Sequence, residues 1–447
     1  MKILKSPALK GTFILMAAGL LTRFIGFYYR IFLSSKIGAE GMGLYQMIFP
    51  VYGLCFSLCV SGIHTSISRY VCRKDVRPKT TLAAGMALAL PLSCLCSGLL
   101  LIFGDSIAIY YLHDSRCGLL LRIIALSLPM AVIHSCISGY FLGKRDAVIP
   151  AISQLFEQVI RVLSVYIIFH CYADSKLGDM SITGLALVAV AGLIIGEIGS
   201  SILCIVALLI EKKRTSVAYL GKHHAISSLD TVKGMIRPIY TMAYPLTMTR
   251  VILGILHSLE ASAVPFFLKR YGLSHSEALS LYGILTAMAM PFIMFPATFT
   301  NAICQMMIPT IAQADSVGNK ERIHALSTKA LMFSLIFGFF CTALFLMSGN
   351  FLGTHFFHSE LAGGFITILA WLCPLMFASS VMGSILNGLG QTKATFYHNL
   401  ASSILLLAFI VLAMPRVGIL GFLWGLLASE LLCAVLHVRK VFETKNK

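Results

Sequence analysis

Long apolar runs that contain few charged residues recur along the whole sequence, and they constrain its fold more than any other feature. A helix that crosses a bilayer needs about 20 mainly apolar residues, and its backbone polar groups must be satisfied within the protein. A transmembrane barrel would instead show alternating segments of about ten residues. The composition agrees, because only 12% of the residues are charged, against roughly 25% in a soluble domain. The sequence therefore predicts an all-α polytopic membrane protein.

The apolar runs between polar breaks predict about twelve transmembrane helices. We expect them near residues 11–35, 44–70, 81–103, 118–142, 147–172, 183–210, 238–268, 278–312, 325–348, 364–388, 394–414 and 418–438. The longest polar stretch falls near the middle of the chain. It divides the sequence into an amino-terminal six-helix lobe (1–210), a cytoplasmic interlobe linker (211–237) and a carboxy-terminal six-helix lobe (238–447).

Lysine and arginine are unevenly distributed over the segments that connect these helices. With the amino terminus inside, 24 of the 35 Lys and Arg residues fall in cytoplasmic segments and six in external loops. The positive-inside rule then places both termini in the cytoplasm of a multi-pass protein of the bacterial inner membrane. The net charge of +17 indicates attraction to the anionic headgroups of the phospholipid bilayer. We see no reason to expect a nucleic acid partner.

The thirteen cysteines do not form a pattern typical of metal sites or disulfide frameworks. Cys55 with Cys59, and Cys94 with Cys96, lie within predicted spans, and Cys-x-x-Cys does not occur anywhere in the sequence. We interpret the cysteines as small, polarizable core residues. The sequence therefore predicts no metal and no cofactor.

The two halves of the chain resemble each other, which indicates an internal repeat. Gly143 after the fourth predicted helix matches Gly388 after the tenth. In the sixth and twelfth helices, the segments 192–197 and 425–430 align and place a glutamate at the same point of each half. Both halves run in the same direction, as in parallel repeats related by an axis along the membrane normal. We expect two bundles around a central cavity.

Several motifs resemble those of the stage V sporulation protein B family. They are Lys10-Gly11-Thr12, Thr22-Arg23-Phe24-Ile25-Gly26-Phe27, the segment from Gly38 to Tyr45, Gly139-Tyr140-Phe141-Leu142-Gly143-Lys144, and Phe295-Pro296. That family belongs to the polysaccharide biosynthesis (oligosaccharide flippase) group of the multidrug/oligosaccharidyl-lipid/polysaccharide exporter superfamily. The resemblance implies that the cargo is a lipid-linked oligosaccharide, with a peptidoglycan precursor, used for the spore cortex, as the expected substrate.

Charged residues within the predicted spans are the candidates for a substrate site. Insertion scales put an Arg at the centre of a membrane helix at roughly +2.5 to +3.5 kcal/mol, so such residues usually face a partner or a water-filled cavity. We expect an anionic substrate to bind a set of polar residues from helices 1, 5 and 7. This set comprises Arg23, Arg30, Glu157, Arg161, Arg250, His257 and Glu260.

The spacing of these residues places them on shared helix faces. Arg23 and Arg30 are seven residues apart, which is about two helical turns. Glu157 and Arg161 are spaced i, i+4, so their side chains can meet, either as a structural pair or as part of the cavity. Arg250, His257 and Glu260 can form one polar stripe.

Three other charged residues in the spans have a structural interpretation. Glu197 and Glu430 occupy matching repeat positions among small residues, as expected of carboxylates bonded to a neighbouring helix. Arg122 lies near the outer end of its helix, where a long side chain reaches the interface.

Three functions fit a chain of this kind. The first is a flippase for anionic lipid-linked sugars, the second a drug/cation antiporter, and the third a membrane-embedded glycosyltransferase or polymerase. A cation exporter needs carboxylates in its cavity, yet helix 1 offers two arginines. The predicted external loops are short, and no constellation of catalytic residues is evident, so we expect a transporter and not an enzyme.

Overall fold

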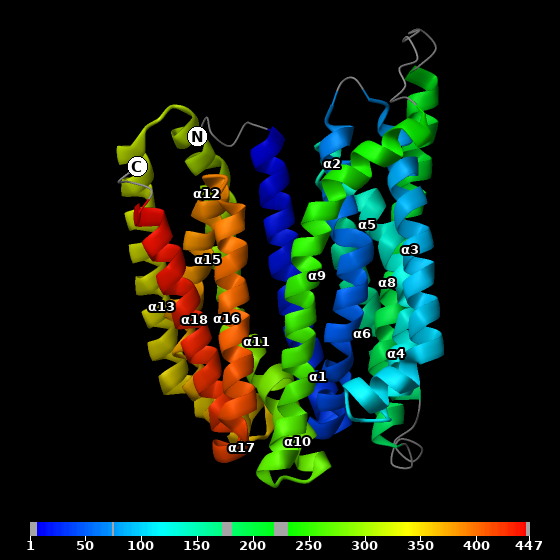
Figure 1. Ribbon diagram of the computed structural model, residues 1–447. Coiled ribbons are helices and arrows are strands. Elements are labelled where there is room, and N and C mark those ends of the chain that lie inside the picture. Colours follow the sequence, from blue (N-terminus) through cyan, green and yellow to red (C-terminus); the bar gives the residue numbers. More distant parts are fainter. Residues whose placement is uncertain (1–6, 74–75, 172–180, 219–230, 444–447) are drawn as a thin grey trace. The chain divides into compact units, whose positions relative to one another are not determined.

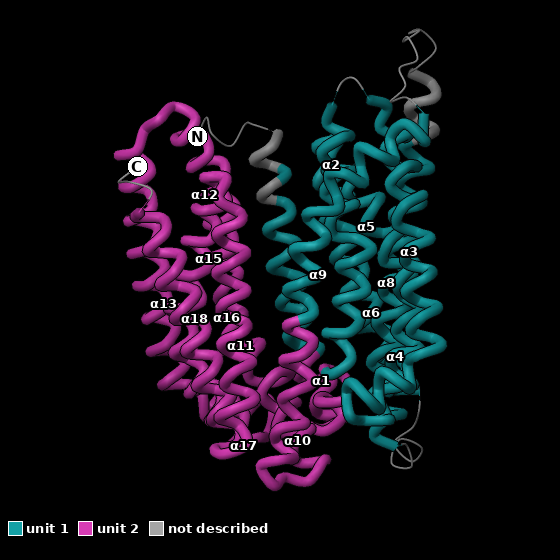
Figure 2. The backbone as a smooth tube through the Cα atoms, in the orientation of Figure 1, with its two compact units in different colours: residues 1–29, 47–255 teal, residues 30–46, 256–447 magenta. Residues whose placement is uncertain are grey.

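The computed structural model describes residues 7–73, 76–171, 181–218 and 231–443. Within these ranges all regular structure is helical and no strand is present (Figure 1). The chain divides into two compact units (Figure 2). The first unit comprises Met1–Tyr29 and Met47–Ile255, and the second comprises Arg30–Gln46 and Leu256–Lys447. The predicted fold class, an all-α polytopic membrane protein, is confirmed.

Among the described residues, the first unit is built from six α-helices and two π-helical segments, together with parts of helices α1 and α9. They are α1 (Pro7–Phe56), η2 (Ser57–Ser61), α2 (Gly62–Val71), α3 (Pro78–Ser106), η3 (Ile107–Tyr111), α4 (Cys117–Ala125), α5 (Ser127–Gly143), α6 (Val148–Cys171), α8 (Ile182–Ala218) and α9 (Val232–Tyr271). Helix α1 contributes residues to both units, and so does α9.

The second unit continues from α9 through a series of helices of unequal length. They are α10 (His275–Gly283), the π-helical η5 (Ile284–Ala289), α11 (Met290–Met294), α12 (Ala297–Ser316), α13 (Lys320–Phe357), α14 (Glu360–Leu369), α15 (Leu372–Gly388), α16 (Thr392–Leu412), α17 (Met414–Val417) and α18 (Ile419–Glu443). Residues 30–46 thus group with the carboxy-terminal unit, and residues 238–255 with the amino-terminal one. The predicted lobe boundaries, 1–210 and 238–447, stay a prediction.

The apolar helices are long enough to cross a membrane many times. By length and composition, nine of the described helical segments qualify, or up to eleven when each of two bent pairs counts as one span. The segment Ile14–Val71 is one of the nine, although its 58 residues far exceed the roughly 20 that one crossing needs. It is interrupted at Gly38, where φ is 68° and ψ is −179°. Glycine alone adopts such a conformation without strain, and the predicted helices 11–35 and 44–70 lie on either side of it.

Both bent pairs break four residues before a proline. Helices α4 and α5 are bent by 41° and helices α14 and α15 by 48°. A proline within a helix lacks an N–H and clashes with the carbonyl four residues earlier. For Pro129 that carbonyl belongs to Ala125, and for Pro374 it belongs to Ala370. Each bend falls within one helix that the sequence predicts, 118–142 for the first pair and 364–388 for the second.

A hydroxyl from a preceding helix satisfies each of these carbonyls. The Oγ of Ser97 on α3 donates to the Ala125 carbonyl at 2.8 Å. The Oγ1 of Thr342 on α13 donates to the Ala370 carbonyl at 2.9 Å. Both bonds are buried, and in both the donor lies 28 residues before the acceptor. The two units therefore repeat one device, which was not predicted from the sequence.

Two further predicted elements differ from the structure. The run 278–312 was expected as one helix, but it is divided among α10, η5, α11 and α12, with a turn at Phe295 and Pro296. Pro291 and Pro296 remove successive backbone donors there. The predicted linker 211–237 includes residues 219–230, which lie outside the described residues, while helix α8 continues to Ala218 and α9 begins at Val232. Charged residues such as Lys and Glu favour helix, which explains the extension of α8.

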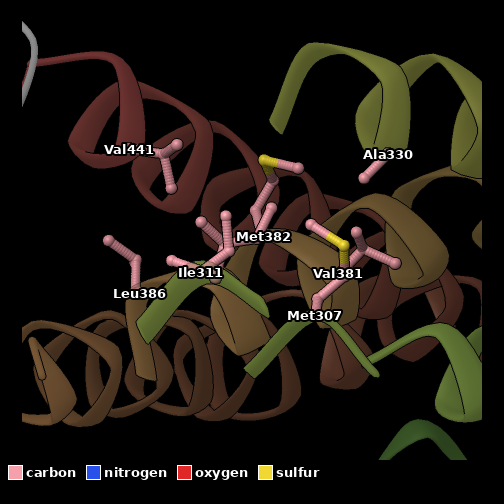
Figure 3. Packing of buried hydrophobic residues seen from close by; sticks show 8 residues of the cluster. Met307, Ile311, Ala330, Val381, Met382, Leu386 and Val441 are labelled. Carbon is pink, nitrogen blue, oxygen red and sulfur yellow. The ribbon is translucent and has the colours of Figure 1, made fainter. Parts of the chain in front are cut away.

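The core of the second unit is formed by apolar residues of four helices. A cluster of buried side chains joins α12, α13, α15 and α18, as Figure 3 shows. It consists of Met307, Ile311, Ala330, Val381, Met382, Ile385, Leu386 and Val441.

Candidate functional site

The first polar group lies on α6, where Glu157 and Arg161 form the ion pair that their spacing predicted. A side-chain oxygen of Glu157 contacts Nη2 of Arg161. The Nη1 of Arg161 also donates to Oε1 of Gln158 at 3.3 Å. The side chains of Arg161 and Glu157 are only 20% and 15% exposed, so the pair is largely enclosed by protein.

Glycines on α8 allow that helix to pack closely against this turn of α6. A Cβ atom at Gly196 would lie 2.9 Å from the Glu157 carbonyl oxygen and 3.2 Å from Cβ of Arg161. A Cβ atom at Gly192 would lie 2.1 Å from Cγ2 of Val165. Glu197 directly follows Gly196, so the close approach brings its carboxylate to the same level of the unit.

His134 on α5 joins the two carboxylates into one cluster. Its Nδ1 lies 3.8 Å from Oε2 of Glu157 and 3.7 Å from Oε2 of Glu197. Its Nε2 is 3.1 Å from Oγ of Ser153, and Oγ of Ser200 lies 3.3 Å from Nδ1. We call His134, Glu157 and Glu197 the His–Glu cluster. Among the described residues, Oε2 of Glu197 has no hydrogen-bond partner.

The His–Glu cluster has the chemistry to hold a proton or a cation. One ligand atom from each of the three residues lies within 4.8 Å of the others. Each side chain is between 12% and 15% exposed, so the group is shielded from solvent. Glu157 and Glu197 were predicted separately from the sequence, whereas His134 was not predicted. A histidine in an apolar run was the available signal, but only the packing of α5, α6 and α8 shows that the three residues meet.

Arg23 and Arg30 on α1 fall into different units. Arg23 belongs to the first unit and is exposed, whereas Arg30 belongs to the second and is partly buried. Helix α1 packs on α6 one turn away, because a Cβ atom at Gly26 would lie 3.2 Å from Nε2 of Gln158. The predicted shared role of Arg23 and Arg30 stays a prediction.

The polar residues predicted on α9 also divide between the units. Arg250 is exposed in the first unit and interacts electrostatically with His64 on α2. In the second unit, Nδ1 of His257 lies 3.0 Å from Oε2 of Glu260. The His257 side chain is 65% exposed and that of Glu260 only 10%.

The remaining charged residues of the spans have charged neighbours as well. Glu430 on α18 interacts electrostatically with His257, so the carboxylate at the second repeat position also lies near a histidine. Arg122 pairs with Asp105 across α3 and α4, and both side chains are about half exposed. The structural interpretations of Arg122 and Glu430 stay predictions.

Apolar helices of membrane-spanning length, with ionisable groups among them, define a multi-pass membrane protein. Its fold is that of transporters of the MOP superfamily. A solved structure described as the inward-facing conformation of a multidrug resistance MATE family transporter aligns with a TM-score of 0.72 and 13% identity, covering 95% of this chain and 94% of that one. A MOP superfamily transporter from Pyrococcus furiosus aligns with a TM-score of 0.69 and 12% identity, covering 99% and 96%.

Sequence comparison identifies the family. The model of the family described as "Polysaccharide biosynthesis protein" matches residues 8–315, and that described as "MatE" matches residues 255–412. The chain belongs to the polysaccharide biosynthesis protein family. The resemblance inferred from the sequence motifs is confirmed.

The names of the relatives in this group indicate different functions. Stage V sporulation protein B of Bacillus subtilis (strain 168) is 26% identical over 444 residues, which cover 98% of this chain and 84% of the relative. Lipid II flippase MurJ of the same organism is 22% identical, covering 87% and 74%. Multidrug export protein MepA of Staphylococcus haemolyticus is 21% identical, covering 99% and 92%.

Proposed function

We propose that this protein is a flippase that moves a lipid-linked anionic oligosaccharide from the inner to the outer leaflet of the bacterial cell membrane by alternating access. The proposed cargo is a peptidoglycan precursor, used for the spore cortex. Family membership supports the transport function, and the similarity to Stage V sporulation protein B and to Lipid II flippase MurJ supports the cargo.

The observation that carries the proposal is the exposure of two arginines inside apolar spans. Arg23 lies within the span Ile14–Val71 and Arg250 within Val232–Tyr271, and both are exposed. A guanidinium that faces lipid near the bilayer centre costs at least roughly 2.5–3.5 kcal/mol. Both groups are therefore better accommodated along a water-filled path, where an anionic cargo can reach them.

The chemistry of these side chains suits a diphosphate. A guanidinium presents a planar fork of donors that matches two phosphate oxygens, and charge-assisted hydrogen bonds are stronger than neutral ones. Arg30 is proposed to extend the same cationic path. Arg161 is proposed as a weaker contributor, because its charge is balanced by Glu157. His257 and Glu260 are proposed as polar contacts to the sugar.

A reconstituted transport assay tests this proposal. The purified protein in liposomes is supplied with fluorescent lipid II, with an undecaprenyl-linked oligosaccharide, or with a cationic dye. Protein-dependent flipping of either lipid-linked sugar, without dye export, is the expected result. Transfer of sugar to an acceptor in the same liposomes would instead favour a glycosyltransferase or polymerase.

The His–Glu cluster favours a second candidate, a drug/cation antiporter. Two partly buried carboxylates beside a histidine provide the acidic groups that a cation-coupled exporter needs. Dye export that depends on a sodium or proton gradient, and that is lost in a Glu157→Gln variant, would support this function over the flippase.

A further inference from the structure

The first unit also contains a basic pocket, and none of the residues that line it has been discussed above. It has a volume of about 530 Å³ and is formed where α2 ends and α9 begins. Arg69, Tyr70 and Arg73 line one side of this pocket, and Arg237 and Thr241 line the other. All three arginines are exposed. We call it the α2–α9 pocket.

Tight packing below the pocket fixes its walls. A Cβ atom at Gly62 would lie 2.3 Å from the Ala243 carbonyl oxygen, so α2 and α9 approach each other at backbone distance there. Near the pocket, Met235 and Ile239 of α9 belong to a buried apolar cluster against which Tyr70 packs. The position of the pocket is thus set by helix packing and not by a loop.

The side chains on the α2 wall are also held in place. The Tyr70 hydroxyl donates to the Pro238 carbonyl at 3.4 Å, which bridges the two helices. The guanidinium carbon of Arg73 lies 5.6 Å from the centre of the Tyr70 ring, within the range of a cation–π contact. The aromatic ring therefore contacts one of the three guanidinium groups that line the pocket.

The charge of the pocket selects an anion. Three guanidinium groups surround it, and among the described residues that line it none is acidic. Arginine presents a fork of donors that matches phosphate oxygens. A group with more than one negative charge on phosphate is the ligand that best complements this arrangement.

The location of the pocket indicates how such a ligand arrives. The apolar span Ile14–Val71 ends beside Arg73, and the span Val232–Tyr271 begins a few residues before Arg237. The pocket therefore lies at the level of the lipid headgroups. Basic pockets between membrane helices on the cytoplasmic side bind such headgroups, and this end is the one that the sequence predicts to be cytoplasmic.

We infer that the α2–α9 pocket binds the phosphate headgroup of a multiply charged anionic lipid. Two sources carry this chemistry. One is a bilayer lipid with two phosphates, such as cardiolipin, and this source is independent of the proposed transport function. The other is the diphosphate of a lipid-linked sugar, which would reach the pocket before transport and which rests on the proposed function.

Binding is measured by thermal unfolding of the purified full chain in a neutral detergent. Cardiolipin, phosphatidylcholine and inorganic pyrophosphate are the probes. The test variant combines Arg69→Gln, Arg73→Gln and Arg237→Gln. The matched control is Arg322→Gln, an exposed arginine in the first turn of α13 that does not line the pocket. A second variant replaces the same three pocket arginines with lysine, which keeps the charge but loses the fork.

Cardiolipin is expected to raise the unfolding midpoint of the wild type and of Arg322→Gln by several degrees more than phosphatidylcholine does. The triple glutamine variant should lose most of this shift, and the lysine variant should retain part of it. A similar shift with pyrophosphate would assign the pocket to a diphosphate, and its absence would assign it to the bilayer lipid. Equal stabilisation of the wild type and the triple glutamine variant by both anions would overturn the inference. If the triple glutamine variant does not fold, the cardiolipin-induced shifts of Arg69→Gln alone and of the lysine variant are compared with that of the wild type instead.

Discussion

At the scale of single residues, position inside a span distinguishes the arginines more clearly than their number does. Arg23 and Arg250 are exposed within apolar spans, whereas the side chain of Arg161 is only 20% exposed. A ligand can reach an exposed guanidinium more readily than one that is largely enclosed by protein. Arg23 and Arg250 are therefore the residues on which the proposed cationic path depends most.

Replacing Arg23 or Arg250 with alanine is expected to abolish most flipping of lipid-linked sugar. A hydrogen bond to a charged group contributes about 1.5–3 kcal/mol, so each change should lower transport about tenfold to a hundredfold. Lysine at either position should restore transport only in part, because it is a point charge without the fork. Initial rates in liposomes, normalised to reconstituted protein, measure the effect.

Arg122→Ala is the control for this prediction. Its ion pair with Asp105 is about half exposed, and such pairs contribute about 1 kcal/mol or less. This variant should transport at nearly the wild-type rate. Normal flipping by both Arg23→Ala and Arg250→Ala would contradict the cationic path while leaving the family assignment intact.

Local spacing explains which parts of the polar site the sequence could predict. The i, i+4 pair of Glu157 and Arg161 and the contact of His257 with Glu260 follow from helix geometry alone. The His–Glu cluster does not, because His134 meets its partners only through packing of three helices. The α2–α9 pocket is non-local in the same sense, since its arginines are distant in sequence.

At the scale of helices, apolar length and proline position determined most of what the sequence could reveal. The runs of apolar residues located the spans. The bend at Pro374 and the division of 278–312 were missed. A proline either kinks a membrane helix or ends it, and the outcome depends on whether neighbouring groups satisfy the freed carbonyl.

The hydroxyls that bind those carbonyls are expected to stabilise each unit. Ser97→Ala or Thr342→Val leaves a buried carbonyl without its partner from the neighbouring helix. Interhelical hydrogen bonds of this kind contribute about 0.5–2 kcal/mol in membrane proteins. Each variant should therefore unfold at a lower temperature than the wild type in the same detergent.

Ser348→Ala provides the comparison for these two variants. Ser348 is on the same helix as Thr342, but its hydroxyl is exposed and donates to the Leu344 carbonyl within that helix. This change should leave the unfolding midpoint nearly unaltered. If Ser97→Ala and Thr342→Val unfold at the same midpoint as Ser348→Ala, the hydroxyls do not stabilise the bent pairs.

At the scale of the whole molecule, the distribution of basic residues sets the expected orientation in the membrane. Reporter fusions at either terminus, or within the polar stretch 211–237, should report a cytoplasmic location. The reason is that 24 of 35 Lys and Arg residues lie in the segments that this orientation puts inside. A periplasmic signal from the polar stretch would contradict the orientation and the two-lobe organisation together.

The membrane potential is expected to drive transport of the proposed cargo. Moving one charge through 100 mV changes its free energy by about 2.3 kcal/mol. The free energy of a diphosphate with about two negative charges therefore falls by about 5 kcal/mol when it leaves an inside-negative compartment. Collapsing the potential with valinomycin and potassium should slow flipping in liposomes. An unchanged rate would mean that another energy source, such as a cation at the His–Glu cluster, is coupled to transport.

The order of the two hydroxyl–carbonyl bonds along the chain has a consequence for biosynthesis. In each unit the donor helix, α3 or α13, precedes the broken pair that it serves. Translation therefore delivers the donor into the bilayer before the proline-interrupted segment leaves the insertion machinery. When the proline-interrupted segment enters the bilayer, the hydroxyl that binds its freed carbonyl is already present on the donor helix. The segment would be poorly tolerated alone in lipid, but it enters next to this helix. If the donor hydroxyl of Ser97 or Thr342 were instead on a helix translated after the bent pair, the freed carbonyl would have no donor during insertion. This would hold even if the folded protein contained the same hydrogen bond.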